Sequence, residues 1–190
     1  FEEVSSWDGV ARVGDDALLS PDWWLWPPEP RPEGVPIRAR FHDGVDVSVP
    51  WPVDQQGGFT HRIPESCFVW KAQAAFGQLE EHELQIPTAR FHLSVLGDGF
   101  GGRTGAVTNW VRDSAQVAAD LLGRFPVDRA QVLMVADARG SSFGLALRGG
   151  GPTAVLLVPN APSDADLAQD WTGVHELLHF AHPPMATAEA

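Results

Sequence analysis

Residues 175–179 read His-Glu-Leu-Leu-His, and this HExxH spacing constrains the chain more than any other feature of its sequence. In a helix, positions i and i+4 lie on one face, a turn apart, so both imidazoles can reach a single metal ion. The glutamate between them points near the same place and can take a proton from a water molecule held there. The motif therefore predicts a Zn²⁺ site with His175 and His179 as metal ligands and Glu176 as the general base.

The residues around the motif favour one continuous helix. Ser163 and Asp166 fit a capping box at its start, and Pro183 and Pro184 end it. Apolar residues recur at helical spacing in between and predict a buried stripe of Leu167, Trp171, Val174, Leu178 and Ala181. The alternative is an amphipathic helix whose two histidines are buried and satisfied by hydrogen bonds, with no metal.

The second half of the chain reads as a helix, three strands and the HExxH helix. Helical periodicity begins at Thr104 and runs to about Phe125, where Pro126 stops it. Short apolar runs predict strands at residues 130–136, 143–147 and 153–158.

The first half reads as β-rich. Alternating residues predict strands at 37–41 and 45–49, and residues 67–70 read as another. Apolar positions between Phe76 and Val95 predict two or three more. Short strands separated by turns indicate an antiparallel, sandwich-like domain.

The pattern changes in the glycine-rich segment 97–102. We place a domain boundary there, between a β-rich N-terminal domain at residues 1–97 and a second domain at residues 98–190. The predicted fold class is α+β.

Composition excludes some partners. The 190 residues carry a formal net charge of −12, which argues against nucleic acid and against an anionic membrane surface. No run of about 18 apolar residues is present, so no transmembrane segment is predicted. Cys67 is the single cysteine, which leaves the compartment open. A secreted or periplasmic location is compatible with the sequence if a signal peptide was removed before Phe1.

A catalytic zinc needs a third protein ligand, and the sequence does not supply an obvious one. His182 is two helical turns from His175, about 10 Å away along a straight helix. Glu189 follows His179 by ten residues and is a poor candidate near the chain end. The spacing HExxHxxGxxH fails, because Met185 stands where its third histidine belongs.

The motif and the order of elements before it resemble the gluzincin zinc metallopeptidases, and more narrowly the group of glycyl aminopeptidases and leukotriene hydrolase. That resemblance implies a β-rich domain followed by the first part of a thermolysin-like catalytic domain. It implies a third ligand, a glutamate, downstream of Ala190. It also implies peptide or protein substrates, and a partner in the remaining C-terminal part of the catalytic domain, on the same or a separate chain.

Many aminopeptidases of this group hold the substrate amine with a glutamate in a Gly-x-Met-Glu-Asn segment before the HExxH helix. Residues 148–155 occupy that region here and contain no carboxylate, so the sequence does not support exopeptidase specificity. Gly149, Gly150 and Gly151 are the candidate substrate-binding residues. With an edge strand expected at 153–158, their amides could hold an extended peptide. The alternative for the three glycines is a plain tight loop.

Two other functions stay open at this point. One is a non-catalytic binding or scaffold module with an incomplete metal site, with which the acidic surface and the tryptophans at 23, 24 and 26 are compatible. The other is a different zinc hydrolase on the same scaffold, such as an epoxide hydrolase.

Overall fold

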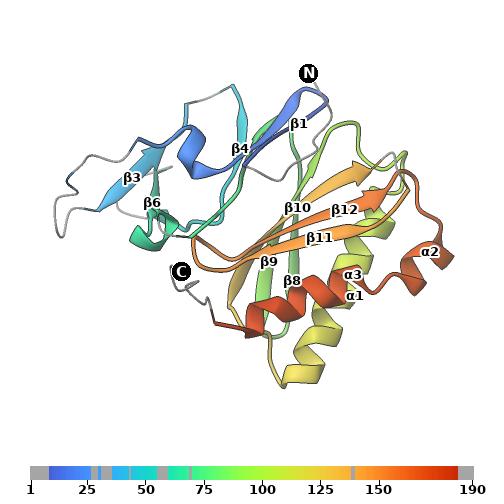
Figure 1. Cartoon of the computed structure of the whole chain (residues 1–190). Coiled ribbons are helices and arrows are strands. Elements are labelled where there is room, and N and C mark those ends of the chain that lie inside the picture. Colours follow the sequence, from blue (N-terminus) through green and yellow to red (C-terminus); the bar gives the residue numbers. More distant parts are fainter. Residues whose placement is uncertain are drawn as a thin grey trace, which may run out of the picture.

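The computed structural model describes residues 9–26, 30, 36–42, 44–54, 60–68, 70–137 and 140–183 (Figure 1). Glu189, considered above as a metal ligand, lies outside them. The described part is an α+β structure with antiparallel sheets first and then a mixed sheet with helices, which confirms the predicted fold class.

The centre of the molecule is a five-stranded sheet of order β11-β12-β10-β9-β8. Strands β9 (Ala89–Leu96), β10 (Arg129–Asp137) and β12 (Thr153–Pro159) run parallel to one another. The edge strands β8 (Glu80–Ile86) and β11 (Phe143–Leu147) are antiparallel to their neighbours. Residues 132–136 of β10 and 154–158 of β12 are continuous apolar runs, as expected for strands covered on both faces. The strands predicted in the second half of the chain are therefore confirmed.

Helix α1 (Thr104–Leu122) crosses from β9 to β10 and covers one face of this sheet. Its buried residues recur at helical spacing and pack on Phe91, Leu93 and Val132. The helix ends where Gly123 adopts a left-handed conformation with φ of 78°, as glycines after a helix commonly do. The predicted helix is confirmed, with its end at Leu122.

The N-terminal strands cover the other face (Figure 1). One antiparallel sheet has the order β1-β2-β7-β4, formed by β1 (Val10–Val13), β2 (Asp16–Leu19), β7 (Ala74–Gly77) and β4 (Asp46–Ser48). A second has the order β3-β6-β5, formed by β3 (Ile37–Arg40), β6 (Thr60–Ile63) and β5 (Val53–Asp54). Short 3-10 helices η1 (Pro21–Trp23) and η2 (Glu65–Phe68) connect them.

The strand predicted at residues 67–70 is wrong, because Cys67 and Phe68 belong to η2. Pro64 starts this turn, and its carbonyl accepts a hydrogen bond from the Cys67 amide at 3.0 Å. A short apolar run does not by itself distinguish a strand from one turn of a helix.

The segment that carries the HExxH motif is not one helix. It forms α2 (Asp164–Gln169), α3 (Thr172–Leu178) and η3 (His179–Ala181). The predicted Ser163–Asp166 capping box is present at the start of α2. Asp170 then adopts an extended conformation and its carboxylate accepts a hydrogen bond from the Thr172 amide at 2.8 Å, so a new helix starts.

The break at Asp170 also changes which residues are buried. The predicted stripe is correct in part: Leu167 is buried and Leu178 is half-buried against the core, whereas Trp171 is 68% exposed and Ala181 is exposed. The buried residues of α3 and η3 are instead Gly173, Glu176, Leu177 and Phe180. None of the helices in the described part of the chain combines the length and the apolar character needed to cross a membrane.

The division into two domains at residue 97 stays a prediction. Strands β8 and β9 precede that residue, yet they pair in one sheet with β10, which follows it. A division that keeps the five-stranded sheet whole would fall before Glu80.

Asp16 links the N-terminal antiparallel sheet to the central five-stranded sheet. Its side chain is buried, and its two carboxylate oxygens accept hydrogen bonds from the amides of Gln78 at 2.8 Å and Gly97 at 2.6 Å. Gly77 leaves the room for it, since a Cβ there would lie 1.8 Å from the Asp16 Oδ1. The carboxylate therefore joins β2 to the turns that precede β8 and follow β9.

We expect Asp16→Asn to lower the free energy of unfolding by about 1–3 kcal/mol, because the new NH₂ group must face one of the two amide donors. Chemical denaturation measures this. Asp15→Asn is the matched control, since the Asp15 side chain is fully exposed and should give almost no change. Equal effects of the two substitutions would contradict the role of Asp16.

The capping box gives a pH dependence. Hydrogen bonds from the Ser163 hydroxyl, and then from the Ser163 amide, hold the pKa of Asp166 below its ordinary value of 3.8. Because folding lowers this pKa, the stabilisation is fully present at a pH above the pKa of Asp166 in the unfolded chain. It is lost as the pH falls through the pKa of Asp166 in the folded protein. The stability difference between the unsubstituted protein and Asp166→Ala should therefore be constant near neutral pH and shrink below 3.8. A difference that does not change on acidification would contradict this.

Candidate metal centre

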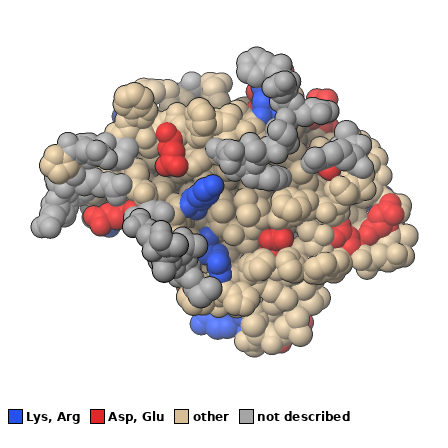
Figure 2. Space-filling model, viewed as in Figure 1, with Lys and Arg blue, Asp and Glu red and all other residues tan. Residues whose placement is uncertain are grey.

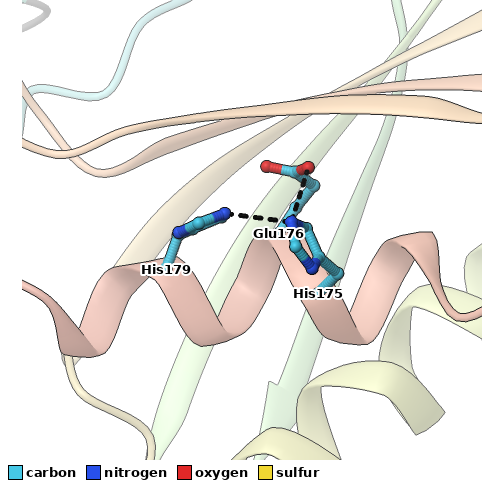
Figure 3. A group of neighbouring side chains, drawn as sticks. All are labelled: His175, Glu176 and His179. Atoms are coloured by element: carbon cyan, nitrogen blue, oxygen red, sulfur yellow. Dashed lines mark hydrogen bonds and ion pairs between the residues drawn. The ribbon is translucent and has the colours of Figure 1, made fainter.

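The two histidines and the glutamate of the motif converge on one side of the helical segment. Figure 3 shows both rings and the carboxylate rising from that side toward the strands. The Nε2 atoms of His175 and His179 are 3.1 Å apart, and Glu176 Oε1 lies 3.9 Å from His175 Nε2. One ligand atom from each residue lies within 4.8 Å of the others. Sequence reasoning had brought together the same three residues.

This geometry fits a zinc ion. Two histidine nitrogens at about 2.0–2.1 Å from a tetrahedral zinc would be about 3.3 Å from each other, close to the observed separation. The carboxylate of Glu176 is farther off, which suits a base beside the metal better than a ligand. Among the described residues the cluster has these three members, so it provides two imidazole ligands and leaves other coordination positions open.

Burial separates the roles of the three side chains. His175 has 44% of its side chain exposed and His179 is half-buried, so both imidazoles can be reached from solvent. Glu176 has only 10% of its side chain exposed. Its orientation is therefore fixed by packing, whereas the two imidazole rings stay accessible to an ion.

Gly144 on β11 provides the space that Glu176 occupies. A Cβ at residue 144 would lie 2.1 Å from the Glu176 Cγ and 2.8 Å from its Cδ, so no larger side chain fits there without moving the glutamate. Sequence reasoning missed this residue. The available signal was a glycine inside a predicted strand, which often marks a close approach of another part of the chain.

Gly173 lets α3 pack closely on α1. A Cβ there would lie 2.6 Å from the Ser114 Oγ and 2.9 Å from the Trp110 ring. The Trp110 indole also donates a hydrogen bond to the Asp170 carbonyl at 3.1 Å, just before α3 begins. Helix α1 thus sets the position of the first turn of α3.

Arg148 and Trp171 contact the two ends of the motif. The Arg148 guanidinium donates hydrogen bonds to the carbonyls of His179 at 3.3 Å and His182 at 2.8 Å. The ring of Trp171 meets that of His175 edge-on, with centroids 4.7 Å apart. Arg148 and His182 also line a cavity of about 260 Å³ beside η3.

The remaining candidates lie elsewhere or have other contacts. The backbone leaves the helix at His182, whose ring is 5.8 Å from that of His179 and which does not belong to the three-residue cluster. Asp166 belongs to the capping box of α2, and the Asp170 carboxylate accepts the hydrogen bond from the Thr172 amide.

The three glycines predicted to bind substrate pack against the N-terminal part of the chain. A Cβ added at Gly149 or Gly150 would overlap Trp70, and a Cβ added at Gly151 would overlap Pro50. The Gly150 carbonyl accepts a hydrogen bond from the Trp51 indole at 2.9 Å. Their role in binding substrate stays a prediction, and these contacts by themselves explain why residues this small are needed.

The expected edge strand is wrong. Residues 153–158 lie in β12, which is paired on both sides, whereas β11 forms the edge of the sheet next to α3. After β11 the chain turns back, so that β12 runs antiparallel to β11 and lies between β11 and β10.

The surface shows where charge gathers. Figure 2 shows acidic side chains over α2 at one end of the molecule, whereas the few basic groups visible on that face are scattered. The described part of this face therefore has no broad basic patch of the kind that binds nucleic acid.

Comparison with known proteins gives a match in structure alone. No protein-family model matches the sequence. No curated protein matches it either. The structure is similar to the crystal structure of an aminopeptidase N family protein from Idiomarina loihiensis, with a TM-score of 0.66 and 14% sequence identity over 92% of this chain. The match covers 32% of that protein, so the chain spans about a third of its length. At this identity the similarity establishes the fold.

We expect Gly144→Ala to displace Glu176 and to lower the free energy of unfolding by about 1–3 kcal/mol, because the new methyl group overlaps the glutamate side chain. In a Glu176→Ala background the same substitution should cost much less, which a double-mutant cycle measures.

Gly105→Ala is the matched control, because a Cβ at that helical position meets nothing within 4 Å. It should leave stability unchanged or raise it slightly. An equal cost of Gly144→Ala with and without the Glu176 side chain would contradict the close approach.

Proposed function

We propose that this chain carries the N-terminal β-rich part and the first part of the catalytic domain of a zinc-dependent metallopeptidase. His175 and His179 would be two of the zinc ligands, and Glu176 the general base. The observation that carries the proposal is the convergence of two imidazole nitrogens at 3.1 Å with a buried carboxylate beside them. The similarity in fold to an aminopeptidase N family protein supports it.

The chemistry divides between the metal and the glutamate. Zinc, when bound, would act as a Lewis acid that polarises the scissile carbonyl and lowers the pKa of water toward neutral pH. Glu176 takes the proton of the attacking water on a carboxylate oxygen and passes it to the nitrogen of the departing amine. Its packing against Gly144 holds the carboxylate still during both transfers.

A peptide substrate fits the edge of the sheet. In the described part of the chain β11 pairs with β12 alone, and it lies beside α3. The side of β11 turned away from β12, along residues 144–147, would bind an extended peptide as one more strand, close to Glu176 and the two histidines. In this proposal β11, and not residues 153–158, binds the extended peptide at the edge of the sheet. No carboxylate for a substrate amine has been assigned, so we propose peptide hydrolysis without exopeptidase specificity.

The rest of the site would come from other residues. We propose that a glutamate downstream of Ala190, on this chain or on a separate one, completes the zinc ligands. A division into two domains belongs to the same proposal, and the pairing of β8 and β9 with β10 favours a boundary before Glu80 over one at residue 97. The competing function, a non-catalytic binding module, is favoured by one observation: the described cluster holds only two imidazoles and one carboxylate.

Metal analysis and one substitution test the enzyme directly. The intact protein should contain one zinc per chain at neutral pH, and Glu176→Gln should retain it while peptide hydrolysis falls by about 10²–10⁴-fold. His175→Ala and His179→Ala should lose stoichiometric zinc. His82→Ala is the control, because His82 lies on β8 and contacts Glu80 instead.

The binding module predicts a different outcome. In that case zinc is absent or substoichiometric, and Glu176→Gln leaves any peptide hydrolysis unchanged. Zinc retained by both histidine variants would also refute the assignment of His175 and His179.

A further inference from the structure

A second cavity, of about 230 Å³, lies on the sheet face opposite to α3. One wall is the segment Val49, Pro50, Trp51 and Pro52 that follows β4. The other wall is formed by the neighbouring ends of β8, β9 and β10, and its charged or ring-bearing polar residues are Glu83, Arg90, His92 and Arg129. Nothing in the proposed peptidase site uses these residues.

Strand pairing places two arginines side by side in this wall. Arg90 on β9 and Arg129 on β10 are direct partners in the parallel ladder. The next residues along, Phe91 and Ala130, are buried in the core against α1. Because successive side chains point to opposite faces of a sheet, both arginines project away from α1 and α3 and toward the cavity.

Neither guanidinium has a hydrogen bond or an ion pair with any described residue. Like charges directly opposite each other on neighbouring strands destabilise a sheet. The chain is strongly acidic and has carboxylates available for such pairing, as other arginines show: Arg38 with Asp54, Arg103 with Asp164, and Arg124 with Asp128. Both arginines are exposed, so in the described part of the chain their N–H donors are available to an anion.

The other polar groups of the cavity already have hydrogen-bond partners within the protein. Glu83 Oε1 lies 2.9 Å from His92 Nδ1, and Glu81 Oε1 lies 3.1 Å from His92 Nε2. The Gln131 amide is held by Ser48 and Thr153 in a buried network. The two guanidinium groups are thus the donors left over for a ligand, while Val49, Pro50 and Pro52 offer an apolar surface in front of the buried Trp51.

We propose that this cavity binds a small organic anion whose carboxylate or phosphate bridges Arg90 and Arg129 and whose apolar body lies against Val49 and the two prolines. The planar guanidinium group is the side chain best suited to such groups, because its N–H donors match a pair of oxygens. The volume restricts the ligand to one smaller than the usual drug-sized molecule. This site is independent of the proposed zinc centre.

Isothermal titration calorimetry on the intact protein tests the site with three probes: benzoate, phenyl phosphate and the uncharged benzamide. We expect one of the anions to bind with a stoichiometry of one, and benzamide not to bind. Arg90→Gln and Arg129→Gln should each lower the affinity for the anion by roughly tenfold or more, since each removes half of a bidentate charged contact. The stronger of the two anions identifies carboxylate or phosphate as the preferred group.

The control is Arg112→Gln, on α1, where the arginine contacts Asn109. It should leave binding unchanged. In the absence of ligand, the Arg90 and Arg129 variants should unfold at a temperature no lower than that of the unsubstituted protein, because each removes one of two neighbouring like charges. The proposal is overturned if neither anion binds up to roughly 10 mM. It is overturned equally if benzamide binds as well as the anions, or if both variants unfold at lower temperatures and bind normally.

Discussion

The candidate metal centre depends on how closely the HExxH helix approaches the edge strand of the central sheet. Glu176 occupies the space that a side chain on residue 144 would fill, and only glycine leaves that space free. The approach buries the carboxylate and leaves the two imidazoles facing solvent. A helix held farther from β11 would leave Glu176 free to rotate, and a freely rotating base loses the positional advantage on which proton transfer depends.

The rest of the fold holds α3 in that place. Helix α1 lies on the same face of the sheet and contacts α3 through Gly173 and Trp110. Arg148 binds the carbonyls at the other end. The N-terminal sheets cover the opposite face, where they form the cavity lined by Arg90 and Arg129. The five-stranded sheet thus separates the two proposed sites, one for a cation and one for an anion.

The sequence predicted the elements whose signals are local. Strands β10, β11 and β12 and helix α1 follow from apolar periodicity bounded by glycine and proline, and the three motif residues follow from helical spacing. The break at Asp170 was not predicted, because a side chain that caps a new helix looks the same in sequence as one on a solvated face. Gly144, the edge position of β11 and the Arg90–Arg129 pair were missed because they depend on strand order, which one sequence does not encode locally.

Anomalous diffraction at the zinc absorption edge, from crystals of the intact protein grown with zinc, tests the central claim most directly. We expect one strong peak within coordination distance of the Nε2 atoms of both His175 and His179, with the Glu176 carboxylate beside it and packed on Gly144. A map without a peak at this place, or one in which the two rings bind separate ions, would rule out the proposed zinc centre.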